Sequence, residues 1–197
     1  MNNISRRSLV LSSVALAACS ADPVPIDNYY RIEAAGTVPS RPGGPLDAVA
    51  EVVPLRGEGI INARAILYRV SGAQLRQYTY HFWTDPPGAM LQRALIDALR
   101  KANAFRTVAA PEMRLNRDYE VLGTLRKFEQ DLEGSPEVDV EIEFGVRKLG
   151  SGQTTLLKTY TAEERCRDRS VATAVKVFST AFNRIVAEFV GDLGQLS

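Results

Sequence analysis

The chain has 197 residues, enough for one domain with a substantial hydrophobic core. Its 24 basic and 23 acidic residues give a formal net charge of +1, which leaves no surplus of Lys and Arg for binding a nucleic acid. With two cysteines and one histidine, the sequence predicts neither a metal site nor a cofactor.

The first residues have the pattern of a bacterial lipoprotein signal. Arg6 and Arg7 precede an apolar run over residues 9–16, and Leu16-Ala17-Ala18-Cys19 matches the lipobox, Leu-small-small-Cys. The run is about half of the ~20 residues that a membrane-spanning helix needs, which argues against an uncleaved helical anchor. We therefore expect residues 1–18 to be removed and Cys19 to become the acylated N-terminus of a chain with formal charge −1.

Two features of this segment concern its destination. Ser5-Arg6-Arg7-Ser8-Leu9 resembles a twin-arginine export motif, although two arginines also suit a Sec signal, so the export route stays open. Ser20 after Cys19 resembles an outer-membrane address in bacteria that sort lipoproteins by this position. The sequence thus predicts a protein anchored by lipid to the periplasmic face of the outer membrane.

The mature chain is expected to have two parts. Residues 19–28 are short, polar and proline-containing, which favours a lipidated tether. Residues 29–197 are expected to form a single domain. Its first strand is predicted at Tyr29–Ile32, and prolines and glycines over residues 39–45 indicate a loop before a second strand at Asp47–Leu55.

The middle of the chain predicts a hairpin followed by a helix. Residues 64–70 and 74–82 are rich in β-branched and aromatic side chains and flank Ser71-Gly72-Ala73. Asp85 before two prolines predicts a helix N-cap, and apolar residues at one-face spacing carry the helix to about Ala102.

The last part of the chain predicts strands and a long final helix. Strands are expected at residues 105–108, 118–130, 138–147 and 154–161, with Gly123 marking a bulge or a close approach. Ser170 is the predicted N-cap of a helix whose apolar stripe ends at Leu193. We therefore expect an α+β fold in which two amphipathic helices pack on one face of a mostly antiparallel sheet.

A search for chemistry finds few candidates. His81 is the single histidine and lies among aromatic residues at a strand end, which favours a packing role. Once Cys19 is acylated, Cys166 is the remaining thiol; its flanking arginines would lower its pKa, but a half-buried bystander is the favoured interpretation. Asp139, Glu141 and Glu143 alternate along a strand, too far apart to share one calcium ion, and we expect them to be solvated and paired with Arg126 or Lys127.

The aromatic cluster Tyr78-Thr79-Tyr80-His81-Phe82-Trp83 is the best candidate for a binding surface. Alternation would place Tyr78, Tyr80 and Phe82 on one strand face and His81 and Trp83 on the other. We take Tyr80, His81 and Trp83 as a candidate partner or ligand surface, with core packing as the alternative.

Four segments together resemble the ABC-type transport auxiliary lipoprotein family, which includes the paraquat-inducible C-type lipoproteins. The segments are Tyr29-Tyr30-Arg31-Ile32, Ile66-Leu67-Tyr68-Arg69, Trp83-Thr84-Asp85-Pro86-Pro87 and Leu125-Arg126-Lys127-Phe128-Glu129. Phe82 departs from the pattern, since a basic residue is expected before the tryptophan.

The resemblance implies a non-enzymatic accessory component of an MCE-type lipid transport system. Its partners would be an MCE-domain protein and an ABC transporter permease and ATPase, with the membrane reached through the lipid anchor and no catalytic residue involved. The sequence leaves open a homo-oligomer and direct contact with lipid. An independent lipid-binding or small-ligand-binding lipoprotein, with a cavity between helices and sheet, is the alternative; a tethered hydrolase is disfavoured because no nucleophile and base are paired in a motif.

Overall fold

A computed structural model of the chain describes residues 25–33 and 38–196. The predicted signal at residues 1–18, the lipidation site Cys19 and the first part of the tether lie outside the described residues. Within these ranges, no helix combines the length and the apolar character needed to cross a membrane.

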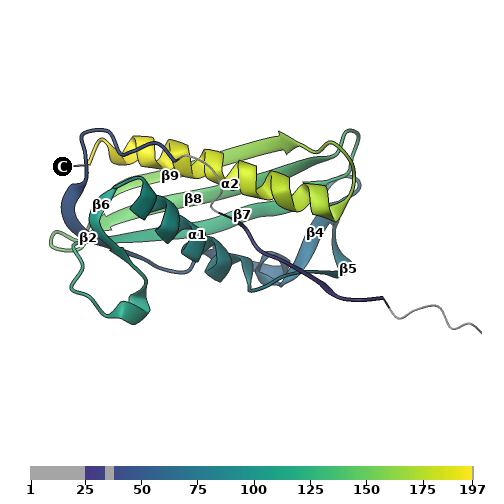
Figure 1. Cartoon of the computed structure of the whole chain (residues 1–197), viewed down its shortest axis with the longest axis horizontal. Helices are drawn as coiled ribbons and strands as arrows, with labels where there is room; N and C mark the ends of the chain where they lie inside the picture. Colours follow the sequence, from purple (N-terminus) through teal and green to yellow (C-terminus); the bar gives the residue numbers. More distant parts are fainter. Residues whose placement is uncertain (1–24, 34–37, 197) are drawn as a thin grey trace, which may run out of the picture.

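Two helices lie across one face of a large curled sheet (Figure 1). The helices are α1 (Pro87–Lys101) and α2 (Val171–Leu193), and two short 3-10 turns are η1 (Gly59–Asn62) and η2 (Pro111–Met113). The strands are β1 (Asn28–Tyr30), β2 (Leu46–Val52), β3 (Arg56–Gly57), β4 (Ala65–Arg69), β5 (Leu75–Trp83), β6 (Phe105–Ala109), β7 (Tyr119–Asp131), β8 (Glu137–Lys148) and β9 (Gln153–Arg165). The α+β class is thus confirmed.

The sheet is mixed, so the expectation of a mostly antiparallel sheet was wrong. The hairpin β4–β5 and the meander β7–β8–β9 are antiparallel, as their short turns require. In contrast, β1–β5, β2–β6, β2–β7, β3–β7 and β4–β7 are parallel. The reason is the connections: α1 and the irregular segments form crossovers, and a crossover returns the chain in the same direction.

Strand β7 is the axis of the sheet. Its full length pairs with β8, whereas its other edge pairs in succession with β2, β3 and β4. Leu55, between β2 and β3, packs close to this axis: a Cβ on Gly123 would lie 2.7 Å from its Cγ atom. The predicted close approach at Gly123 is therefore confirmed.

The start of α1 differs from the prediction. Pro86 rather than Asp85 occupies the N-cap, with φ −51° and ψ 135°, and no side chain caps the helix. A residue before proline is disfavoured in the helical region, so Pro87 keeps Pro86 extended and delays the helix by one position. The Asp85 carboxylate pairs instead with the guanidinium of Arg93.

The start of α2 was predicted correctly. Ser170 is the N-cap, and its hydroxyl accepts a hydrogen bond of 3.2 Å from the Thr173 amide. Asp168 accepts hydrogen bonds from the Ser170 amide and from the Thr173 hydroxyl, at 2.9 and 3.0 Å. The Ser170 hydroxyl also donates to Asp168, and this bond above all, together with the other two, holds the pKa of Asp168 well below its usual range.

Side chains from both helices and the sheet form one hydrophobic core. The ring centroids of Phe144 and Phe189 are 4.6 Å apart, and those of Phe128 and Phe178 are 4.5 Å apart. The predicted stripe of α2 is buried from Val171 to Leu193, except that Val175 is half-buried. Strongly packed aromatic rings therefore fill the space between α2 and the sheet.

Candidate interaction surfaces

The structure separates the three residues that the sequence grouped as a candidate surface. Trp83 is 1% exposed and packs against Phe128 and Phe178, with ring centroids 5.2 and 5.3 Å away. His81 is half-buried, whereas Tyr80 is 40% exposed. Of the three, Tyr80 alone is positioned to meet a partner directly.

An irregularity in β5 explains why simple alternation does not describe this cluster. The register with β4 shifts between the pairs Ala65–Phe82 and Leu67–Gln77. Tyr78 consequently lies against His81, with an edge-to-face ring contact of 5.8 Å, rather than beside Tyr80. Such bulges re-aim side chains and are not visible in the residue pattern.

His81 is held by aromatic neighbours. Its Nδ1 atom lies 2.9 Å from the hydroxyl of Tyr30, and the two rings stack with centroids 5.7 Å apart. Tyr78, which meets the imidazole edge to face, donates a hydrogen bond from its hydroxyl to Gln130 Oε1 at 2.8 Å. The imidazole therefore serves as a polar link between β1 and β5.

Aromatic side chains gather beside the exposed Arg64 where β1 joins β5; Phe82 among them is half-buried, and the exposed Ile26 precedes them in the chain. We call Ile26, Tyr29, Tyr80, Phe82 and Arg64 the edge patch. Ile26, Tyr29 and Tyr80 are 81%, 56% and 40% exposed. The ring centroids of Tyr29 and Phe82 are 5.8 Å apart, and the Arg64 guanidinium carbon lies 5.5 Å from the centroid of the Tyr29 ring. Sequence reasoning missed this group because Tyr29 and Tyr80 are 51 positions apart and the β1–β5 pairing is parallel.

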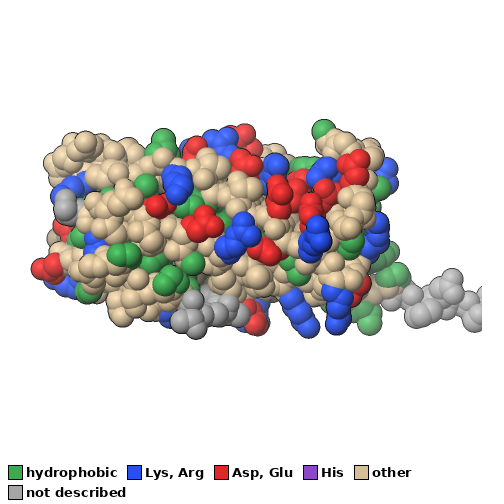
Figure 2. Space-filling view, turned by 90° about the horizontal axis from the view of Figure 1, so that it is seen from above, with side chains coloured by type: hydrophobic (Ala, Val, Ile, Leu, Met, Phe, Trp, Pro, Cys, Tyr) green, Lys and Arg blue, Asp and Glu red, His purple; other side chains and the backbone are tan. Residues whose placement is uncertain are grey.

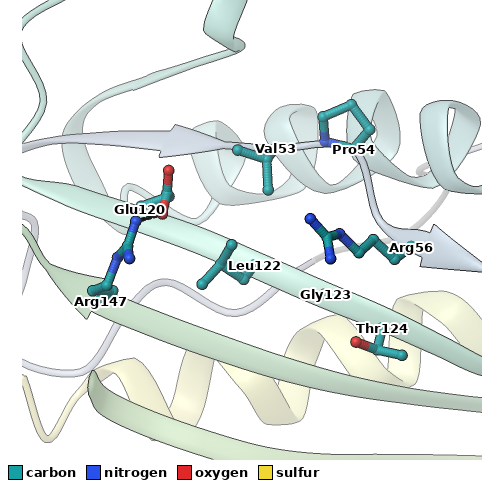
Figure 3. Close-up of a pocket in the computed structure, with 8 residues that line it drawn as sticks. All are labelled: Val53, Pro54, Arg56, Glu120, Leu122, Gly123, Thr124 and Arg147. Atoms are coloured by element: carbon teal, nitrogen blue, oxygen red, sulfur yellow. Dashed lines mark hydrogen bonds and ion pairs between the residues drawn. The ribbon is translucent and has the colours of Figure 1, made fainter. Parts of the chain in front are cut away.

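An open cavity of about 650 Å³ lies where the chain passes from β2 to β3 (Figure 3). Val53 and Pro54 line one side, and β7 contributes Leu122, Gly123 and Thr124. Arg147 and Glu120 form an ion pair at one end, and the side chain of Arg56 reaches back over the cavity. The lining mixes charged, hydroxyl and apolar groups, unlike the enclosed apolar pocket of a lipid-storage protein.

Acidic residues gather around Arg69, at the ends of β4 and β7. Arg69 pairs with Asp131, with Glu129 and Asp139 at 3.5 Å each, and with Glu133 at 3.3 Å. Burial raises the pKa of Glu129 and of Asp139, and neighbouring carboxylates add to the effect. Figure 2, which views the molecule from above, shows acidic and basic side chains interleaved, with acidic groups gathering toward the right-hand end.

The predicted solvated acids of β8 behave in two ways. Glu143 pairs with Arg126 at 2.8 Å and Glu141 approaches Lys127 at 4.0 Å, as expected. Asp139 was expected to be solvated too, but it is 6% exposed, and its Oδ1 atom has no hydrogen-bond partner among the described residues. Its burial follows from the parallel β4–β7 pairing, which brings Arg69 over this end of the sheet.

The Cys166 thiol and the acidic side chains of the described residues are not arranged as a reactive or metal-binding site. Cys166 is buried, and this burial, with the charge of Asp168, raises the pKa of its thiol to about 11. The flanking arginines thus do not activate it. Across residues 25–33 and 38–196, no group of three or more His, Cys, Asp or Glu side chains is placed to hold a metal ion.

Comparisons with known proteins give a consistent picture. A family model described as "ABC-type transport auxiliary lipoprotein component" matches residues 30–190. The chain is similar to the crystal structure of protein XCC0632 from Xanthomonas campestris, of family DUF330, with 21% identity, a TM-score of 0.75, and coverage of 85% of this chain and 97% of that one. It is also similar to dodecameric PelC from Paraburkholderia phytofirmans, with 14% identity, a TM-score of 0.51, and coverage of 77% and 95%. No curated protein matches the sequence.

Proposed function

Because the chain belongs to the family of ABC-type transport auxiliary lipoprotein components, we propose that it is a lipid-anchored accessory component of an MCE-type intermembrane lipid transport system. The observation that carries this proposal is the family match over residues 30–190, which spans nearly all of the domain expected at residues 29–197. The partners would be an MCE-domain protein and the permease and ATPase of the transporter. The protein acts by docking and tethering, not by catalysis.

The anchor is the first part of the proposal. Cys19 in the Leu-Ala-Ala-Cys sequence is the acylated residue, residues 19–28 are the tether, and Ser20 favours the outer membrane. Each buried CH2 of an acyl chain contributes roughly 0.8 kcal/mol, so three chains hold the domain far more firmly than a single, reversibly bound chain.

The state of the reactive side chains supports a non-catalytic role. A thiol with a pKa of about 11, as in Cys166, carries little thiolate at neutral pH. The Nδ1 atom of His81 is engaged by Tyr30, and the imidazole ring stacks on Tyr30 and meets Tyr78 edge to face. Neither group is arranged as a nucleophile and base.

The packed core argues against the alternative of an independent lipid-binding protein. That function needs an apolar cavity between helices and sheet, but Phe144, Phe178, Phe182 and Phe189 are fully buried in this space. The described cavity at β2 and β3 opens to solvent at the edge of β7 instead. A docking domain, by contrast, requires surfaces rather than interior volume.

The length of the domain suits a role in which one end is tethered to a membrane and the other end contacts the transporter. β7 has 13 residues, so the sheet extends about 43 Å along it at ~3.3 Å per residue. The tether joins the domain at β1, beside the β4 and β5 end, and η2, which ends at Met113, lies toward the other end (Figure 1). Met113 and Leu115 are 63% and 41% exposed, and this distal end is the one that we propose docks the transporter.

Genetics in the native bacterium tests the proposal. Deleting the gene is expected to reproduce the envelope defects caused by deleting the transporter, and the double deletion should add nothing. Cys19→Ala should give the same defects, because it releases the domain from its membrane, whereas His81→Ala should not. Additive defects, or full function of Cys19→Ala, would contradict the proposal.

A further inference from the structure

The edge patch lies at the point where the tether enters the domain. Ile26 stands seven positions after Cys19, so an extended chain spans about 25 Å between them at most. Asn28 Nδ2 donates a hydrogen bond to the Tyr80 carbonyl at 3.3 Å, and β1 pairs with β5 from Asn28 to Tyr30. The entry point is therefore fixed to β5, and the edge patch cannot move far from the anchored residue.

The composition of the edge patch is that of a membrane-interface contact. Tyr side chains favour the headgroup region, where the ring meets apolar material and the hydroxyl stays hydrated. Arg64 adds a cation: its Nε donates to the Trp83 carbonyl at 3.2 Å, which holds the exposed guanidinium over Tyr29. Ile26, at 81% exposure, is the most exposed large apolar residue of the described chain.

We propose that the edge patch is a membrane-contact surface, which lies on the phospholipid headgroups of the bilayer that holds the lipid anchor. This inference rests on the anchoring part of the proposed function but not on the identity of the transporter. Asp27 lies beside Tyr29, with its carboxylate 3.4 Å from the hydroxyl, so the surface is not strongly basic. Apolar and aromatic contact therefore supplies the attraction, and Arg64 pairs with lipid phosphate.

The contact would fix the orientation of the domain. A domain on a flexible tether samples all directions, whereas one that rests on Ile26, Tyr29 and Tyr80 has its β1–β5 edge at the membrane. The long strand β7 then carries the opposite end of the sheet away from the bilayer. Leu157 in β9 provides a matched control, because it is 66% exposed and lies outside the edge patch.

Fluorescence of the acylated protein in vesicles tests the proposal. Single variants Ile26→Trp, Tyr80→Trp and Leu157→Trp are reconstituted in phosphatidylethanolamine and phosphatidylglycerol vesicles that contain a spin-labelled lipid. The native Trp83 is 1% exposed and gives the same background in every variant. Tryptophan at positions 26 and 80 should emit at shorter wavelength and be quenched at least twofold more than tryptophan at position 157.

Two further results bear on the proposal. Arg64→Gln in the Ile26→Trp background should reduce the quenching, because a phosphate contact is lost. Equal quenching at positions 26, 80 and 157 in vesicles that float with the protein would overturn the proposal. Flotation itself reports the anchor, and no transporter is present, so failure of the quenching pattern contradicts the membrane contact alone.

Discussion

At the scale of single residues, Arg41 joins two distant parts of the chain. It is 7% exposed, and its guanidinium donates to the carbonyls of Leu193 at 2.9 Å and Leu196 at 2.6 Å. Leu193 is the last residue of α2 and Leu196 follows shortly after it, where the helix itself no longer supplies donors to its last carbonyls; the Leu193 carbonyl also accepts from the Leu196 amide at 3.1 Å. A buried cation at this end also interacts favourably with the helix dipole.

Arg41→Met should therefore destabilise the domain. The methionine keeps most of the apolar stem but leaves the carbonyls of Gly44, Leu193 and Leu196 without their charged donor, at a cost of about 2 kcal/mol in the free energy of unfolding. Denaturant titration measures the change. Arg106→Met is the control, because the Arg106 side chain is 60% exposed in its ion pair with Asp47. This variant should change the free energy of unfolding by under about 0.5 kcal/mol. Equal effects of the two variants would contradict this role for Arg41.

Arg69 makes a pH-dependent contribution. Burial raises the folded-state pKa of Glu129 and Asp139, so these carboxyls favour folding when protonated, and this contribution is lost as the pH rises through their folded pKa values. Arg69→Met removes the cation that offsets their charge. We expect Arg69→Met to lower the free energy of unfolding by about 2 kcal/mol at pH 7.5, and by clearly less near pH 5, where more of the carboxyls are protonated.

Thermal and denaturant unfolding at both pH values measures this difference. Arg126→Met is the control, because Arg126 pairs with Glu143 and its side chain is more exposed than that of Arg69. This variant should lose little stability, with little dependence on pH. A loss for Arg69→Met that is the same at pH 5 and pH 7.5 would show that the carboxyls do not carry the effect.

At the scale of elements, strand and helix positions were largely predictable, but strand pairing was not. The alternation of Val138 to Val146 and the stripe of α2 depend on local burial, and both appear within a residue or two of their predicted bounds. The parallel pairing of β7 with β2, β3 and β4 depends on crossovers that no local pattern records. The cavity follows from these pairings, and the edge patch follows from the parallel pairing of β1 with β5, so the sequence pointed to Tyr80 but not to Tyr29 beside it.

The final helix α2 is expected to be essential to the core. Phe182 is fully buried, and Phe182→Ala should destabilise the domain by roughly 3 to 5 kcal/mol, because it removes apolar contacts and leaves a cavity. Lys176→Ala, at an exposed position of the same helix, controls for helix propensity and should change the free energy of unfolding only slightly. A loss under about 1 kcal/mol for Phe182→Ala in a denaturant titration would contradict this packing.

At the scale of the whole molecule, the two ends of the sheet have different surroundings. One end receives the tether through β1 and carries the edge patch, and the other carries η2 and the exposed Met113 and Leu115. The proposed function uses both ends: the first meets the membrane and the second meets a transporter. A shielded route between membranes is needed because exposing acyl chains to water costs ~0.8 kcal/mol per CH2.

Photo-crosslinking in intact membranes tests this central claim most directly. A photoreactive residue placed at Met113, in the acylated protein expressed in its native bacterium, should capture an MCE-domain protein or another transporter subunit identified by mass spectrometry. The same residue at Tyr80 should capture lipid instead of these proteins. If no transporter subunit is captured from the distal end, and the purified domain carries bound lipid, the docking account is contradicted in favour of independent lipid binding.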